Sequence, residues 1–357
     1  MWRASVPFLT GPPPWPPRLR RPEPGAAPPA PADLLRARPW QTLRGLARAH
    51  ARDPRLRMVI ERFATYAGAD PRRAPAALAV AGYVEHAFGA WTLRGGLYAI
   101  VEALARRLRA HGGDLRLGAP VTAVERAGGR VRGVVVGGAE RLAADAVVWN
   151  GDALALDRLL DRPPRRGTER SVSGLAVMLA LRGRTPGLVH HEVRFPAAPH
   201  AEFDDVFGAR VLPRDPTVYV SASCASDAGD APAGAENWFV LVNAPAGHED
   251  CAAADEYAAR LVERLGVAER ARFTAVRGPA DLARETGAVG GAIYGAAPHG
   301  RLAPLRRPGP EVPGVRGLFR VGGTVHPGGG LPLVTLGGRS VARQLSGSRP
   351  AHVPSAP

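Results

Sequence analysis

A short run near the C-terminus, Gly322–Val334, restricts the fold more than any other part of the sequence. It follows an apolar strand candidate, Leu318–Val321, and a helix pattern begins near Pro332. Glycine lets the backbone approach a ligand closely, and proline suits the first turn of a helix, where unpaired N–H groups form a positive end. The run therefore predicts a strand–loop–helix unit that either holds an anionic group or is a glycine-rich turn without a ligand.

The rest of the chain mixes helical and strand patterns, which predicts a mixed α/β (α+β) fold. Residues 33–84 favour two or three short helices that begin at an N-cap, Asp33, and residues 97–113 favour an amphipathic helix. A strand meander follows and ends in a buried strand, 146–149. Beyond Asn150, four longer strand candidates suit a mostly antiparallel second sheet. These candidates lie in 171–182, 189–195, 217–223 and 237–245.

Composition indicates a folded protein, because 45% of the residues are hydrophobic and 22% are charged. The net charge is +15, but all 47 basic residues are dispersed arginines, so we expect no nucleic-acid partner. Cys224 and Cys251 fit neither a disulfide framework nor a metal spacing, which favours a cytoplasmic location. The sequence has no apolar run long enough to span a membrane and no signal peptide pattern.

Individual polar residues give weaker signals. We expect no metal site, because His190-His191 lacks a partner at metal spacing, and His326 reads as a loop anchor. Asp145, Asp152 and Asp157 flank strands and are expected to be solvated. The chain has no G-x-S-x-G elbow and no G-x-G-x-x-G fingerprint, so it lacks the usual pyrophosphate-binding turn.

Four segments together resemble the phytoene desaturase and related carotenoid dehydrogenase family. They are RFATYAGADPRRAPAALAVAGYVEHAFGAWTLRGGLYAIVEALARRL, ADAVVWNGD, DPTVYVSAS and LFRVGGTVHPGGGLPLV. The resemblance covers about residues 40 to 345. It implies a flavin amine oxidase-type fold, FAD as cofactor, hydride transfer to the flavin and a long hydrophobic isoprenoid substrate drawn from a membrane.

The resemblance also assigns FAD-contacting residues. The matching positions of the C-terminal motif are Gly322, Gly323, Thr324, His326, Pro327, Gly328, Gly330, Leu331 and Pro332. Val121, on the first meander strand, matches a position whose backbone meets the adenine. No catalytic residue is assigned.

The family's N-terminal βαβ unit with its fingerprint has no match here, so we expect an incomplete FAD-binding Rossmann-like domain interleaved with a mostly antiparallel substrate-domain sheet and helices. The predicted segments are a Pro/Ala-rich leader (1–32), a helical substrate-domain segment (33–90), an FAD-domain helix and meander (91–150), a substrate domain (151–300), a C-terminal FAD-binding segment (301–347) and a tail (348–357).

The leading hypothesis is an FAD-dependent desaturase of carotenoid (isoprenoid) biosynthesis, truncated at its N-terminus. The alternatives are a non-catalytic fragment, a subunit of a split enzyme whose N-terminal FAD-binding half is a separate polypeptide, and a flavin amine oxidase-like enzyme with another substrate. Peripheral contact with the inner face of the membrane is a secondary expectation.

Overall fold

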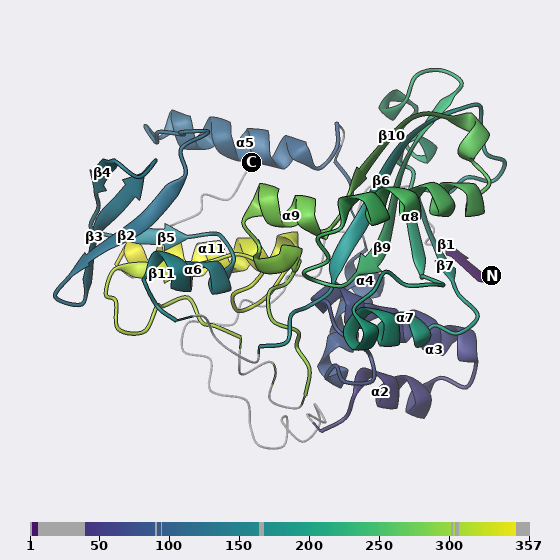
Figure 1. Ribbon diagram of the computed structural model, residues 1–357, viewed down its shortest axis with the longest axis horizontal. Coiled ribbons are helices and arrows are strands. Elements are labelled where there is room, and N and C mark those ends of the chain that lie inside the picture. The colour runs from purple at the N-terminus through teal and green to yellow at the C-terminus, as the bar shows by residue number, and fades with distance from the viewer. Residues whose placement is uncertain are drawn as a thin grey trace.

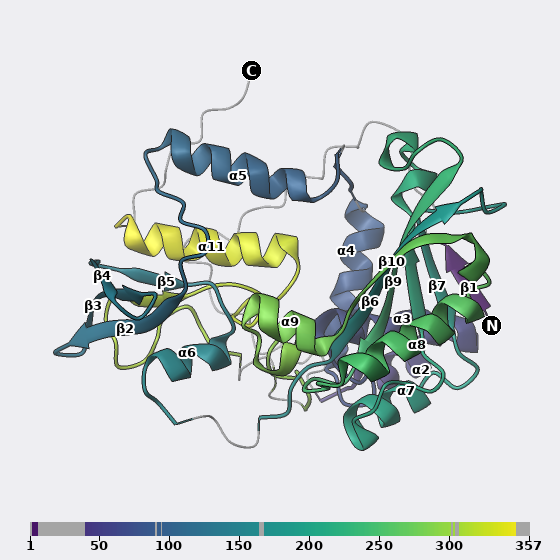
Figure 2. The ribbon, with the colours of Figure 1, turned by 45° about the horizontal axis from the view of Figure 1, so that its top comes forward.

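The computed structural model describes residues 2–5, 40–89, 91–93, 95–163, 168–300, 303 and 307–347. Its strands form a six-stranded, a three-stranded and a two-stranded sheet. Figures 1 and 2 show the six-stranded sheet at one end of the molecule and the two smaller sheets at the other. The chain leaves the two-stranded sheet after β5 (Val147–Trp149), builds most of the six-stranded sheet and returns at β11 (Leu318–Arg320). The predicted mixed α/β fold class is confirmed.

The six-stranded sheet is antiparallel, in the order β1-β7-β8-β9-β6-β10. Its strands are β1 (Trp2–Ser5), β6 (Ser173–Arg182), β7 (His191–Phe195), β8 (Val218–Ser221), β9 (Ala235–Ala244) and β10 (Ala271–Arg277). Side chains alternate between the two faces of a sheet. One face, with Leu175, Val177 and Trp238, packs against α8 (Cys251–Arg264) in a buried core.

The other side of this sheet, which we call the open face, is less covered. It carries Gly174, Ala176, Met178 and Ala180 of β6 and Asn237, Phe239 and Leu241 of β9. Ala180 and Phe239 are exposed, whereas Met178 and Leu241 are half-buried. This face therefore has room for a ligand.

The smaller sheets form the second unit. β5 and β11 pair in parallel, with Val147 opposite Leu318. The three-stranded sheet is the predicted meander, formed by β2 (Val121–Ala127), β3 (Arg130–Val136) and β4 (Glu140–Ala143). A second core joins the meander to α6 (Ala153–Leu159) and β11 through Val124, Leu156 and Leu318. In Figure 2, α11 (Leu331–Leu345) runs between α5 (Tyr98–Ala110) and the small sheets.

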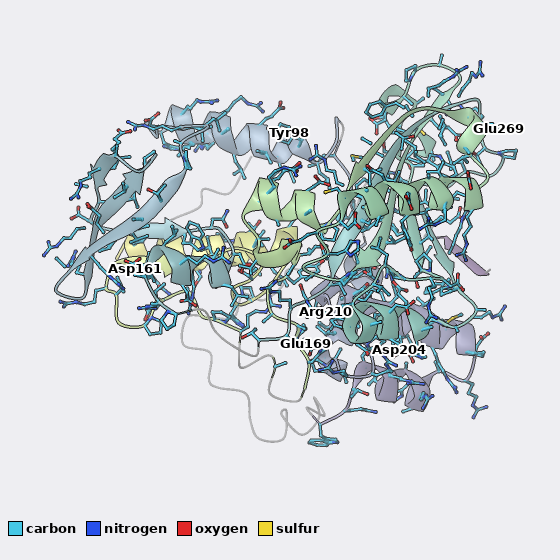
Figure 3. All side chains as sticks on the ribbon, in the orientation of Figure 1. Tyr98, Asp161, Glu169, Asp204, Arg210 and Glu269 are labelled. Atoms are coloured by element: carbon cyan, nitrogen blue, oxygen red, sulfur yellow. The ribbon has the colours of Figure 1, made fainter. Side chains whose placement is uncertain are left out.

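Several helices lie beside the six-stranded sheet (Figure 1). They are α2 (Leu43–His50), α3 (Pro54–Arg62), α4 (Val80–Phe88), the short α7 (Ala201–Phe203) and α9 (Pro279–Thr286). Asp53 caps α3 by accepting the N–H of Arg55 at 2.8 Å, which explains the predicted break at Asp53-Pro54. Arg73 forms an ion pair with Glu169 at 2.6 Å and thereby connects this helical segment to the chain that enters the sheet (Figure 3).

The four predicted strands beyond Asn150 are confirmed as β6 to β9, but the sequence interpretation missed β10, α9 and β1. β10 was missed because its pattern is interrupted by arginine and its Phe273 is exposed. Trp2–Ser5, within the predicted leader, pair with β7. Four residues at a sheet edge gain backbone hydrogen bonds without needing an apolar run. The rest of the leader, the Asp33 cap and the 348–357 tail lie outside the described residues.

The amphipathic helix α5 forms as predicted, but its apolar stripe is uncovered. No residue of α5 is buried, and Leu97, Val101 and Leu104 are 56%, 51% and 66% exposed. Figure 3 shows Tyr98 at the end of α5 nearest the six-stranded sheet. Among the described helices, none combines the length and the apolar character needed to cross a bilayer.

Candidate functional site

Residues 322–330, which we call the glycine loop, connect β11 to α11. The loop starts at the parallel strand pair, because the N–H of Val321 donates to the carbonyl of Trp149 at 2.9 Å. Gly322 has a φ of +103°, and a Cβ there would lie 2.8 Å from Asn150 Oδ1. Only glycine is therefore compatible with position 322, a predicted site residue, because the backbone has a positive φ and a side chain would clash with Asn150.

Thr324 attaches the glycine loop to the start of α6. Its Oγ1 accepts the N–H of Ala153 at 3.0 Å. The preceding residue, Asp152, is 5% exposed and caps α6, with Oδ1 2.9 Å from the N–H of Leu154. Its other oxygen, Oδ2, accepts the N–H of Val289 at 2.8 Å, next to the six-stranded sheet. Asp152 therefore connects the two units at the loop.

The expectation that Asp145, Asp152 and Asp157 are solvated is wrong for two of the three. Asp145 is exposed, whereas Asp152 and Asp157 are 5% and 6% exposed. Asp152 tolerates burial because the N–H groups at a helix start and at Val289 satisfy its oxygens. A carboxylate after a strand and before a helix was the signal that could have identified it as a cap.

Tyr294 and Arg307 hold the glycine loop from the other side. A Cβ at Gly329 would lie 2.5 and 2.6 Å from two ring carbons of Tyr294, so the ring rests against that backbone. Arg307 Nη1 donates to the carbonyl of Gly323 at 2.7 Å. Burial lowers the pKa of the Arg307 guanidinium and raises the pKa of the Tyr294 hydroxyl. No carboxylate among the described residues forms an ion pair with Arg307, so its charge faces the loop.

The remaining motif residues follow along the same segment. The N–H of His326 donates to the carbonyl of Pro308 at 2.8 Å, so its backbone anchors the loop, while its side chain is exposed. The His326–Pro327 peptide is cis, and Gly328 is buried. Gly330 immediately precedes α11, whose first residues are Leu331 and Pro332. The predicted strand–loop–helix unit forms, but sequence reasoning missed Asn150, Tyr294 and Arg307, which reach it from elsewhere in the chain.

Val121, the predicted adenine contact, lies in a different sheet. It is the first residue of β2, pairs with Val136 and is 36% exposed. Its role therefore stays a prediction.

The glycine loop and the start of α11 have the properties expected of one side of a flavin site. A Cβ at Gly330 or Gly338 would meet no atom within 4 Å, so this surface is free for close approach. The first N–H groups of an α-helix have no partner within the helix and carry positive partial charge. These features suit the electron-accepting edge of a flavin. The chain supplies no G-x-G-x-x-G turn for the pyrophosphate.

The open face comes next to the glycine loop at Ile293, the neighbour of Tyr294. A Cβ at Gly174 would lie 3.0 Å from Leu241 Cδ1 and 3.4 Å from Ile293 Cδ1, so there is little room at this end of β6. Asn243, which pairs with Gly174, is buried, and its amide donates to Glu202 Oε1 at 2.6 Å.

His190 and His191 serve local contacts. His191 Nδ1 lies 2.7 Å from Tyr219 Oη, and His190 Nδ1 lies 2.9 Å from Ser226 Oγ. Burial, with a smaller effect of neighbouring His190, lowers the pKa of His191 to about 4. In the described part of the chain, no group of three or more His, Cys, Asp or Glu residues could hold a metal ion.

The arrangement of an antiparallel sheet, a parallel strand pair and a glycine loop can be compared with known proteins. Residues 41–345 match the family model described as flavin containing amine oxidoreductase. The chain belongs to this family.

Among curated relatives of this family member, a hydroxyneurosporene desaturase from Rubrivivax gelatinosus is 36% identical over 332 residues, which are 87% of this chain and 62% of the relative. A zeta-carotene-forming phytoene desaturase from Myxococcus xanthus is 34% identical and is covered over 60% of its length. The chain thus spans under two thirds of the curated relatives it matches. An oxidoreductase structure from Methanosarcina mazei superimposes with a TM-score of 0.58 at 16% identity, covering 85% of this chain and 68% of that one.

Proposed function

We propose that this chain carries the substrate-binding part and the C-terminal cofactor-binding part of an FAD-dependent oxidoreductase that desaturates a long polyene. The observation that carries the proposal is that Ile293, which lies against the open face at Gly174, is followed by Tyr294, whose ring packs against Gly329 of the glycine loop. Through this contact, an aliphatic surface long enough for a linear hydrocarbon ends beside the loop. The carotenoid substrates named for the relatives agree with such a surface.

In this proposal FAD, when bound, would supply the acceptor for a hydride from one carbon of the substrate, and the neighbouring carbon would lose a proton to a base, which leaves the new double bond. The chain's own groups hold it and stabilise the negative charge that this transfer creates. The glycine loop offers backbone that can approach a planar ring closely, and the N-terminus of α11 together with Arg307 places positive charge near that loop. The open face holds the hydrocarbon in line and excludes water from the reacting carbons.

We infer that a fingerprint-bearing βαβ unit, from a separate N-terminal half or from further sequence, completes the FAD site. Two observations support this inference. The chain lacks the G-x-G-x-x-G turn, and it spans 62% to 65% of the first three curated relatives. Apolar side chains of α5 and α11, such as Leu104 and Leu336, are exposed and could be covered by such a βαβ segment.

The alternative of a flavin amine oxidase-like enzyme with another substrate is less well supported. An amine would call for an aromatic or charged cage at the reacting position. Tyr294 meets the glycine loop, but the neighbouring open face is lined by Gly174, Leu241 and Ile293. A hydrophobic substrate drawn from a membrane also leads us to propose a peripheral location at the inner face of the membrane.

The first experiment compares the visible flavin spectrum of this chain alone with that of the chain joined in frame to its upstream coding region. We expect flavin absorbance and polyene desaturation only for the extended protein. A yellow, active short chain would show that the fingerprint is dispensable. If neither form retains flavin, the chain is a non-catalytic fragment and the oxidoreductase proposal is wrong.

A variant tests the contribution of Arg307 in the flavin-binding form. Arg307→Met removes a half-buried cation that contacts the loop, and we expect flavin affinity to fall about tenfold or more, because a hydrogen bond from a charged group contributes about 1.5–3 kcal/mol. Arg339→Met, which removes an exposed arginine from α11, is the matched control and should leave affinity unchanged.

A further inference from the structure

A carboxylate and a phenol lie together beside the open face, and we call them the Glu85–Tyr66 pair. Glu85 is on α4, and Tyr66 follows α3 in the 3₁₀ turn Phe63–Ala67. A Cβ at Gly82 of α4 would lie 2.7 Å from the ring of Phe63, so the helix packs against this turn. The two side chains therefore come from elements that hold each other in place.

Tyr219 of β8 shows where this pair lies on the sheet. Tyr219 is opposite Leu241, and the side chains of two directly opposite residues share a face, here the open face. Burial raises the pKa of the Tyr219 hydroxyl, and the charge of Glu85 adds to that rise. Burial also raises the pKa of the Tyr66 hydroxyl to about 12, with the charge of Glu85 as the next cause. The pair therefore lies at the open face, close to Tyr219.

One aromatic ring separates the segment of Tyr66 from the glycine loop. Gly68, two residues after Tyr66, has a φ of +69°, and a Cβ there would lie 2.8 Å from Tyr294 Cδ2. The other edge of the same ring rests against Gly329 of the glycine loop. The carbonyl of Gly68 also accepts the N–H of Val172 at 3.0 Å, directly before β6. The pair thus lies toward the loop end of the open face, where the proposed function places the reacting carbons.

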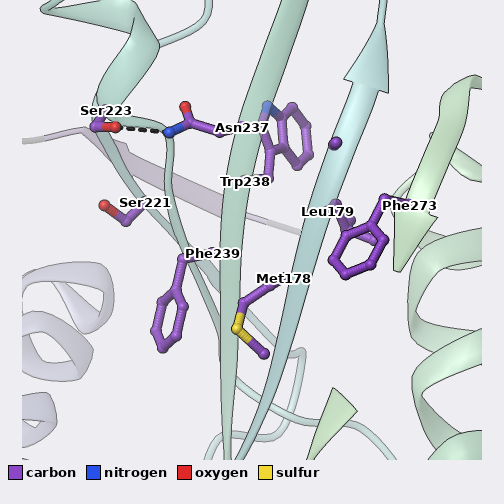
Figure 4. Close-up of a pocket in the computed structure, with 9 residues that line it drawn as sticks. Met178, Leu179, Ser221, Ser223, Asn237, Trp238, Phe239 and Phe273 are labelled. Carbon is purple, nitrogen blue, oxygen red and sulfur yellow. Dashed lines mark hydrogen bonds between the residues drawn. The ribbon is translucent and has the colours of Figure 1, made fainter. Parts of the chain in front are cut away.

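A largely apolar cavity continues from this position along the open face. It has a volume of about 270 Å³, and Met178, Phe239 and Ser221 are among its lining residues (Figure 4). Ser221 is two residues beyond Tyr219 on β8. Two residues of a strand span about 7 Å. A linear hydrocarbon that fills the cavity and continues toward the glycine loop therefore passes the Glu85–Tyr66 pair.

The surroundings of Glu85 favour a carboxylate that can take up a proton. Partial burial of the carboxylate raises its pKa, and a hydrogen bond from Tyr66 opposes that rise without reversing it. Burial raises the pKa of Tyr66 and Tyr219 and the charge of Arg62 opposes it, but Arg62 has no such effect on Glu85. In the described part of the chain, no cation forms an ion pair with Glu85. A carboxylate with a raised pKa is a stronger base than an ordinary one.

We propose that Glu85 is the base that removes a proton from the polyene, and that Tyr66 positions its carboxylate. The inference rests on the proposed function and supplies the step that it leaves open. A hydride leaves one carbon with both electrons of its C–H bond and reduces the flavin. The adjacent carbon loses a proton to Glu85, and the electrons of that second C–H bond form the new double bond. Glu85 is exposed, so solvent then takes the proton and restores the carboxylate.

The test uses the extended, flavin-bound protein and an acyclic polyene that contains a saturated –CH2–CH2– unit, in detergent micelles without oxygen. Stopped-flow loss of the oxidised flavin absorbance gives the rate of flavin reduction, and quenching of tryptophan fluorescence gives the dissociation constant of the polyene. In Glu85→Gln we expect the rate to fall about 100-fold or more at an unchanged dissociation constant, because a positioned base contributes about 10²–10⁴-fold. Glu256→Gln removes an exposed glutamate from α8, which covers the opposite face of the sheet, and should alter neither value.

The pH profile separates a base from a structural role. In the wild-type protein the rate should be lost as the pH falls through the raised pKa of Glu85, and this loss should be absent in Glu85→Gln. Tyr66→Phe removes the hydrogen bond that lowers this pKa, so the loss should begin at a higher pH in that variant.

Three results would overturn the assignment of Glu85 alone: a Glu85→Gln variant that reduces flavin at the wild-type rate, one that loses polyene affinity together with the rate, or one that keeps the wild-type pH profile. A wild-type protein that binds flavin and polyene but reduces no flavin would overturn the proposed desaturation itself, and the base with it.

Discussion

Replacing Asp152 with alanine should destabilise the protein by about 2–4 kcal/mol. Loss of a helix N-cap costs about 1 kcal/mol, and the cap here is the bond from Leu154 N–H to Asp152 Oδ1 at 2.9 Å. The same substitution leaves the N–H of Val289 without the carboxylate that accepts it at 2.8 Å, and an unsatisfied buried donor costs about 1–3 kcal/mol. The total is the sum of these two costs, because each of the two carboxylate oxygens of Asp152 accepts one of the two N–H groups.

Urea unfolding followed by circular dichroism and by tryptophan fluorescence measures this cost. Trp149 contributes to that fluorescence next to the substituted residue, because its indole N–H donates to the carbonyl of Asp152 at 2.9 Å. Asp250→Ala is the matched control: Asp250 also caps a helix, through Ala253 N–H at 2.9 Å, but it is exposed. That variant should lose only about 1 kcal/mol. Equal losses in the two variants would refute the idea that Asp152 connects the two units.

Other substitutions test further contacts. Gly329→Ala forces a Cβ into the Tyr294 ring and should cost about 1–3 kcal/mol in urea unfolding, a penalty that Tyr294→Ala should relieve; an unrelieved penalty would contradict the contact. Glu236→Ala leaves Arg270 without its buried partner, 2.9 Å away, and should cost about 3–5 kcal/mol, whereas loss of the exposed Glu256 should cost under about 1 kcal/mol. Because burial lowers the pKa of His191 from 6.5 to about 4, its contribution to stability is complete above pH 6.5 and is lost as the pH falls toward 4. In the His191→Gln variant the urea midpoint should change less with pH over that range. If the midpoint of the variant falls as steeply with pH as that of the wild-type protein, other groups cause the loss of stability.

The local parts of the fold could be predicted from the sequence. Long strand-forming runs identify β6 and β9, and the dense glycine and proline pattern identifies the loop between β11 and α11. Each of these signals lies within a single segment. Asn150 leaves no room for a side chain at position 322. The glycine-rich pattern of the loop already indicates this requirement without knowledge of Asn150.

The contacts that shape the site could not be predicted in this way. Tyr294 and Arg307 meet the glycine loop only after the chain has passed through the six-stranded sheet, and nothing in their neighbouring sequence distinguishes them from other tyrosines and arginines. Asp152 looked like a solvated strand flank, because its second partner, Val289, lies 137 residues away. Long-range hydrogen bonds decide which polar residues are buried, and a single sequence does not contain that pairing.

Helix α5 shows a different limit. Its apolar stripe was predicted correctly, yet no residue of α5 is buried by the described part of the chain. Burying Leu97, Val101 and Leu104 would contribute about 1.5–3 kcal/mol each, and a helix of this length is marginal without such packing. In the same unit, Val148 of β5 is 42% exposed, although parallel strands are normally covered on both faces. The exposed stripe of α5 and the exposed face of the β5–β11 pair could therefore be covered by the same added element. A βαβ unit could add strands beside the pair and a helix that covers these exposed surfaces. We infer that such a unit binds here, and that α5 and β5 would then gain protection from hydrogen exchange while β6 and β9, already packed against α8, would not.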